Sequence, residues 1–138
     1  MTEPNEQYAY FTITDSFDPA EISQRVGVVA SESWRQGDLN PLTRYERKLS
    51  CWCLHSRLGH EHDLEVHIRD VLSQLDQKRA VFQQLSKEFR GCMQLVGYFY
   101  AGYPGLHFET DIVEGLARYS LSVDFDFYYL YSHAREAS

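Results

Sequence analysis

A cluster of histidines and acids just before a long apolar pattern is the most ligand-like group in the sequence. His60, Glu61 and His62 are followed by Asp63 and then by His67. Imidazoles two positions apart near a helix start could share a divalent ion with Asp63. Two histidines on one helix face need a separation of three or four residues, however, and no HExxH or CxxC motif completes a ligand set. We therefore expect a solvated, charged helix start and no metal site.

The cysteines are the second candidate group. Cys51 and Cys53 share one face of a predicted strand, so both thiolates could meet one soft metal ion, but no second pair of ligands lies nearby in the sequence. Cys92 has no evident partner either. An odd number of cysteines does not form a disulfide framework. Because free cysteine behaves as a small apolar side chain, we expect buried, unreactive thiols.

Two carboxylates on the last predicted strand, Asp124 and Asp126, could divide acid and base roles as in a glycosidase. They project from the same side, roughly 7 Å apart in an extended chain. A pair at this spacing on a strand is more typical of a solvated sheet face. The sequence also lacks a GxSxG elbow, a P-loop and a GxGxxG motif. We therefore predict no catalytic residue and no cofactor, although an enzyme with an unfamiliar site stays open.

The N-terminal elements that must position these groups have clear local signals. After a polar, frayed segment at 1–7, residues 8–14 alternate as a half-buried strand. Asp18 then caps a short helix over 19–26, with Pro19 in its first position and Gly27 at its end. Residues 28–37 indicate a weak strand or a turn around Trp34, residues 38–47 a loop, and residues 49–55 a strand.

The second half is dominated by apolar residues at spacings of three and four. They predict one long amphipathic helix over 63–89, ended by Gly91. Strands follow at 92–101 and 106–109, a helix at about 110–119 with Ile112, Leu116 and Val113 inward, and a last strand at 121–130. The predicted order is β-α-β-β-α-β-β-α-β, an α+β fold with a mostly antiparallel sheet and the helices, one of them long, on one face. We expect a single domain over 1–138, with a tail at 132–138.

Charge and composition limit the partners. The chain of 138 residues has a formal net charge of −7, and 14% of its residues are aromatic, with ten tyrosines. The acidic C-terminal part repels phosphate backbones, so we expect no nucleic-acid partner and favour a basic protein. No apolar leader opens the chain, and no apolar run approaches the ~18 residues of a membrane span. We expect a cytoplasmic protein without membrane contact.

With these elements placed, the sequence resembles the bacterial family catalogued as domain of unknown function 4279. The resemblance runs from about Tyr8 to Tyr129. It implies the fold, and since the family has no established activity it transfers no catalytic residue. The matching residues are Asp18-Pro19-Ala20-Glu21-Ile22, Gly27, Ser33-Trp34-Arg35-Gln36-Gly37-Asp38, Trp52, Leu64-Glu65 and Val123-Asp124-Phe125-Asp126.

The sheet face that the helices leave uncovered is the main candidate site. Alternation along the strands assigns a set of tyrosines and acids to it, which we predict to bind a partner protein. Tyrosine gives a large contact area at low entropic cost, and carboxylates select a basic partner. An ordinary exposed sheet face stabilised by cross-strand aromatic pairs is the alternative. The candidate partner-binding residues are Tyr8, Tyr10, Tyr98, Tyr100, Asp124, Asp126 and Tyr128, with Thr12 beside them.

These features favour a non-enzymatic protein-binding module, most concretely an immunity-like inhibitor that masks a basic toxin or nuclease. One alternative is a small enzyme or ligand-binding protein with a pocket between the long helix and the sheet, and with Trp34, Trp52 or the histidine cluster at its mouth. Another is a homodimer joined through the tyrosine-rich face.

Overall fold

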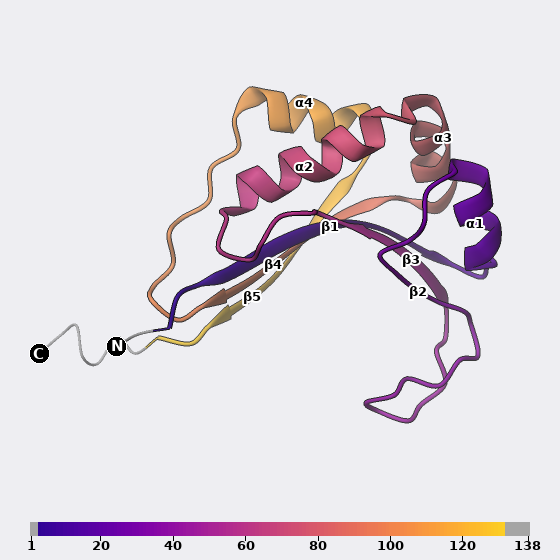
Figure 1. Ribbon diagram of the computed structural model, residues 1–138, viewed down its shortest axis with the longest axis horizontal. Coiled ribbons are helices and arrows are strands. Elements are labelled where there is room, and N and C mark those ends of the chain that lie inside the picture. Colours follow the sequence, from indigo (N-terminus) through magenta and orange to yellow (C-terminus); the bar gives the residue numbers. More distant parts are fainter. Residues whose placement is uncertain (1–2, 132–138) are drawn as a thin grey trace, which may run out of the picture.

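Five strands form one mixed sheet, and four helices lie against a single face of it, in a computed structural model that describes residues 3–131 (Figure 1). The predicted tail at 132–138 lies outside the described residues. The elements are β1 (Glu6–Asp15), α1 (Pro19–Val26), β2 (Glu32–Trp34), β3 (Ser50–His55), α2 (Leu64–Asp76), α3 (Arg79–Phe89), β4 (Cys92–Phe99), α4 (Thr110–Arg118) and β5 (Ser122–Tyr129).

The strands lie in the order β2-β3-β1-β4-β5. The pairs β2–β3, β3–β1 and β1–β4 are antiparallel, and only β4–β5 is parallel. Parallel neighbours need a crossover connection, which the segment containing α4 supplies on the helix side of the sheet (Figure 1). The predicted α+β class, with a mostly antiparallel sheet and helices on one face, is confirmed. None of the helices within residues 3–131 is long and apolar enough to cross a membrane.

The core lies between the helices and the sheet. Alternation along each strand sends every second side chain toward the helices, and burial of a large apolar side chain stabilises the fold by about 1.5–3 kcal/mol. The buried, helix-facing side chains of the central strands are Ala9, Phe11, Ile13, Trp52, Leu54, Met93, Leu95 and Phe99.

The first helix has the predicted bounds and caps. Asp18 Oδ1 accepts a hydrogen bond from the Ala20 N–H at 3.0 Å, and Gly27, at φ 69°, donates its N–H to the Ser23 carbonyl at 2.9 Å. The Arg35 guanidinium also contacts Asp18 Oδ1, at 2.7 Å. This ion pair joins two segments that carry the family resemblance and ties the loop after β2 to the start of α1.

The single long helix predicted over 63–89 is wrong. The chain leaves helical geometry at Lys78, with φ −134° and ψ 49°, and α3 starts in a new direction beside α1 (Figure 1). A straight helix of that length would extend about 40 Å, beyond the ten-residue β1 at about 33 Å and well beyond the eight-residue β4 and β5 at about 27 Å. The polar run Asp76 to Arg79 interrupts the apolar stripe at the point where the helix breaks.

The strand predicted at 106–109 is also absent, so the observed order is β-α-β-β-α-α-β-α-β. Both edges of β4 are already paired, to β1 and β5, which leaves no position beside it for a returning strand. Leu106 and Phe108 instead pack on the core from an irregular segment. Glu109 is the N-cap of α4, and Val113, predicted to face inward, is 53% exposed.

Candidate functional site

The sheet face opposite the helices, here called the open face, gathers the predicted partner-binding residues. Strand register places Tyr8 beside Val96 and Val96 beside Asp126, so these three form one row across β1, β4 and β5. The next rows are Tyr10–Gln94–Asp124 and Tyr98–Tyr128. We call the predicted members of these rows the tyrosine face: Tyr8, Tyr10, Tyr98, Asp124, Asp126 and Tyr128.

Ring stacking orders the aromatic side chains of this face. Tyr98 and Tyr128 stack across β4 and β5 with centroids 4.9 Å apart and planes 8° apart. Tyr10 stacks on His55 at 4.4 Å, and Tyr8 stacks on His60 at 4.7 Å. Such pairs contribute about 0.5–1.5 kcal/mol beyond area burial and restrict the rotamers of the rings. The face therefore presents aromatic groups that are already held in place before any partner binds.

The Asp126 carboxylate raises the pKa of the nearby hydroxyls of Tyr8 and Tyr128. Burial raises the pKa of Tyr8, and the neighbouring Tyr98 and Asp126 raise it further. A hydrogen bond with Asp126 is the main cause of the raised pKa of Tyr128. The hydroxyls thus stay protonated and can donate hydrogen bonds. Val96 lies beneath these groups and is only 3% exposed, although none of the helices in the described part of the chain covers this side.

Two of the predicted open-face residues differ from the others. Tyr100 lies just beyond the end of β4, where its backbone N–H donates to Asn5 Oδ1 at 2.8 Å. Thr12 contacts the thiols of β3: its hydroxyl oxygen lies 3.4 Å from the Sγ atoms of both Cys51 and Cys53. The other candidate residues are brought together as one surface.

The paired thiols form a separate, buried cluster on the open face. Cys51 Sγ and Cys53 Sγ are 3.4 Å apart, and both residues are buried. The hydrogen bond between the two thiols lowers the pKa of Cys51 and raises that of Cys53. The Arg47 guanidinium lies 3.9 Å from the centre of the Trp34 ring beside them.

The structure distributes the histidine cluster over different environments. His60 is on the open face against Tyr8, whereas His67 is fully buried in α2, where its Nδ1 lies within hydrogen-bond distance of the Ser56 hydroxyl. His62 contacts His67 edge to face, with ring centroids 6.3 Å apart. Within the part of the chain that the structure describes, no three His, Cys, Asp or Glu side chains are grouped as metal ligands.

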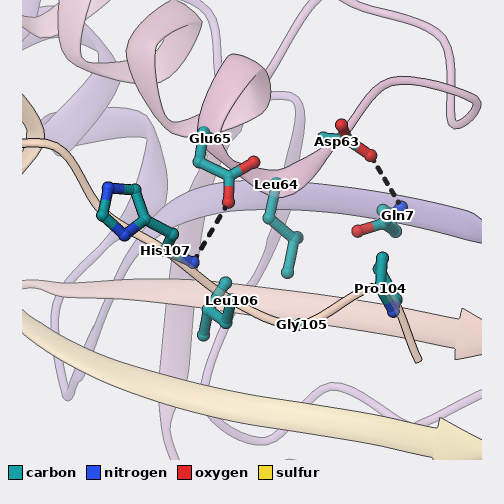
Figure 2. Close-up of a pocket in the computed structure, with 8 residues that line it drawn as sticks. All are labelled: Gln7, Asp63, Leu64, Glu65, Pro104, Gly105, Leu106 and His107. Carbon is teal, nitrogen blue, oxygen red and sulfur yellow. Dashed lines mark hydrogen bonds between the residues drawn. The ribbon is translucent and has the colours of Figure 1, made fainter.

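A hollow of about 300 Å³ lies where the N-terminus of α2 meets the start of β1 and the segment 104–107 (Figure 2). Asp63 accepts a long hydrogen bond of 3.5 Å from Gln7, and Glu65 accepts one of 3.4 Å from the His107 backbone N–H. Two carboxylates beside Leu64 and Leu106 make this hollow suited to a small organic cation. Its lining is Gln7, Asp63, Leu64, Glu65, Pro104, Gly105, Leu106 and His107.

The predicted mouth residues do not line this hollow. Trp52 is buried in the core, where its Nε1–H donates to Ser23 Oγ at 2.9 Å, and Trp34 belongs to β2 at the far edge of the sheet. His55 was not among the predicted binding residues. Alternation along β3 could have assigned it to the open face, because Trp52 and Leu54 point to the other side of the sheet. His107 has no comparable signal, because an irregular loop positions it.

Comparison with known proteins identifies the family but no function. The model of the family described as domain of unknown function, DUF4279, matches residues 5–130, which is nearly the whole chain. No curated protein and no solved structure is significantly similar to the chain. The chain belongs to the DUF4279 family, as the sequence motifs predict.

Proposed function

We propose that this protein is a cytoplasmic, non-enzymatic protein-binding module that uses the tyrosine face to bind a partner with a basic surface. The observation that carries the proposal is that the four helices of residues 3–131 lie on one side of the sheet, so the tyrosine face on the other side stays uncovered by them (Figure 1). The most concrete version is an immunity-like inhibitor that masks the basic surface of a toxin or nuclease.

The chemistry of the face fits such a partner. Interface hot spots are enriched in tyrosine, which supplies contact area and a hydrogen-bonding tip at once. Asp124 and Asp126 attract a basic surface, and the net charge of −7 accelerates its approach. The Tyr98–Tyr128 stack reduces the entropy lost on binding, because both rings are restricted beforehand.

The thiols support the proposed compartment. Cys51, Cys53 and Cys92 are all free, although two of the sulfur atoms lie 3.4 Å apart. Disulfides form and persist in oxidising compartments and are rare in the cytosol. An odd number of cysteines, two of them only two residues apart, does not form a disulfide framework, which agrees with the proposed cytoplasmic location.

The test is affinity capture of the tagged full chain from its native lysate, read by mass spectrometry. The informative variant is Tyr98→Ala/Asp126→Lys on the tyrosine face. A matched control, Val113→Ala/Glu114→Lys, makes the same charge change on the exposed outer side of α4. We expect one basic protein to be retained by the wild type and the control and lost by the face variant. Equal retention by all three forms would refute the proposed surface, provided that their melting temperatures agree.

A second candidate function is binding of a small organic cation in the hollow of Figure 2. The observation in its favour is the pair of carboxylates, Asp63 and Glu65, on the wall of a cavity of about 300 Å³. A ligand that binds only the folded state raises the melting temperature. A rise with agmatine or spermidine that disappears in Asp63→Asn/Glu65→Gln would support this function, and no rise with millimolar ligand would exclude it for these compounds.

A further inference from the structure

The outer edge of β5 is an eight-residue strand without a backbone partner among residues 3–131. The Ser122 N–H donates to the Gly91 carbonyl at 3.1 Å, and the Leu130 N–H donates to the Phe99 carbonyl at 2.9 Å. In a parallel pair, alternate residues direct both backbone groups to the same neighbour. Even-numbered residues of β5 therefore bond to β4, and the N–H and C=O groups of Val123, Phe125, Phe127 and Tyr129 point outward.

Side chains on both faces of this edge are exposed. On the helix side, Phe125 is 50% exposed and Tyr129 is 54% exposed, because the helices do not extend over the edge strand. On the open face, Asp124 and Asp126 are exposed and Tyr128 is 41% exposed. Each face of β5 thus offers a different chemistry, aromatic on one side and acidic on the other.

Proteins usually protect such an edge with proline, lysine, bulges or a covering element. The segment Ser122–Tyr129 contains no proline and no lysine, and it pairs with β4 in unbroken register. The two aspartates are its only charged residues. They repel an acidic strand and favour a basic strand as the neighbour.

We propose that the outer edge of β5 binds an extended, basic segment of the partner protein as a sixth strand of the sheet. The segment alternates basic side chains, which face Asp124 and Asp126, with apolar side chains, which cover Phe125 and Tyr129. Main-chain hydrogen bonds to the outward groups of β5 give affinity, and the alternation gives specificity. This inference rests on the proposed function, since it assigns a binding mode to the acidic side of the tyrosine face.

Charge repulsion disfavours a second copy of this chain as the strand that pairs with the outer edge of β5. Two copies of β5 could pair antiparallel about a two-fold axis, with the helices of both copies on the same side of the joined sheet. The two strands overlap most when this axis passes through Phe125 or through Asp126. The first register places Asp124 opposite Asp126 twice, and the second places Asp126 opposite itself. Like charges directly opposite each other are destabilising. A strand with basic side chains on the open face replaces this repulsion by attraction.

The probe is a capped heptapeptide of alternating lysine and valine, titrated into the isotope-labelled full chain and followed by amide NMR at low salt. A glutamate–valine heptapeptide is the matched control. We expect the basic peptide to shift the amide signals of Val123, Phe125, Phe127 and Tyr129 and to slow their hydrogen exchange. It should bind at least about tenfold more tightly than the acidic peptide.

Two variants separate backbone pairing from side-chain contact. Phe125→Ala removes the ring and keeps the outward N–H, whereas Phe125→Pro removes the ring and the N–H but leaves the bonds to β4. We expect the proline variant to bind the basic peptide several-fold more weakly than the alanine variant, on the order of one hydrogen bond. Should the proline variant unfold, hydrogen exchange in the wild type still tests the pairing.

Each remaining outcome decides a different claim. Unchanged β5 amides at millimolar basic peptide, or equal binding of the two peptides, would overturn strand addition. Shifts confined to Tyr8 and Tyr98 would overturn it while leaving the proposed function intact. A dimer in sedimentation with protected β5 amides would assign the edge to a second copy. Peptide binding at the edge combined with equal partner capture by the tyrosine-face variant would refute the proposed function and keep the edge site.

Discussion

The buried imidazole of His67 predicts that the protein loses stability as the solution is acidified below about pH 6.5. His67 is fully buried, and its Nε2 has no hydrogen-bond partner among residues 3–131. Burial lowers its pKa, and the nearby His60 and His62 lower it further, while Asp70 acts in the opposite direction. The folded state therefore holds His67 neutral at a pH where the unfolded chain takes up a proton.

The sign and size follow from proton linkage. A histidine whose pKa is lowered in the folded state does not change the free energy of unfolding at pH values above its pKa in the unfolded chain, about 6.5. As the pH falls below that value, it destabilises the fold. Between pH 7.5 and 5.5, one histidine that stays neutral in the folded state reduces the free energy of unfolding by at most about 1.4 kcal/mol. His55, whose pKa is also lowered by burial, adds to the loss in the same direction.

The assay is urea unfolding at pH 7.5, 6.5 and 5.5, followed by the fluorescence of the buried Trp52. The informative variant is His67→Asn, which keeps a polar group near the Ser56 hydroxyl and removes the titration. His107→Asn is the control, because the side chain of His107 is 77% exposed. We expect His67→Asn to lose about 1 kcal/mol less than the wild type between pH 7.5 and 5.5. Equal losses in the wild type and in His67→Asn would refute the reasoning.

Three further changes test the fold by equilibrium unfolding. Ser23→Ala removes the acceptor of the buried Trp52 N–H and should destabilise by about 1–3 kcal/mol; a loss within 0.5 kcal/mol would contradict the importance of this bond. Asp18→Ala removes a side-chain cap and should cost about 1 kcal/mol, more than Asp63→Ala, whose side chain makes no cap bond; equal losses would disprove the capping role. Gly97→Ala places a Cβ 2.4 Å from the Phe99 ring and should destabilise by about 1–3 kcal/mol through overpacking, so an unchanged midpoint would show that the ring moves freely.

The sequence predicted the helix bounds best where all the signals that begin and end a helix lie at that helix itself, as in α1. The cap, proline and terminal glycine of α1 determine its bounds, because all of them act within one turn of the helix. The break at Lys78 could not be predicted in the same way. It depends on the length of the sheet that the helix covers, and the apolar spacing continues on both sides of the break.

The candidate site was predictable to the extent that strand alternation determines it. Alternation assigned Tyr8, Tyr98 and Asp126 to one face, and strand register then brings them together. Strand order is a tertiary property, so the parallel β4–β5 pair and the resulting open edge had no local signal. The contact of His60 with Tyr8 depends on a loop, whose path the sequence does not specify.

The most direct test of the central claim is the dissociation constant of the captured basic protein, measured with the purified wild type, Tyr98→Ala/Asp126→Lys and the control Val113→Ala/Glu114→Lys. We expect the tyrosine-face variant to weaken binding by about 30-fold or more, which corresponds to loss of a hot spot of about 2 kcal/mol. The control should stay within about threefold of the wild type, since surface changes away from the interface have small effects. Equal dissociation constants for the wild type and the tyrosine-face variant would contradict the assignment of the tyrosine face as the binding surface.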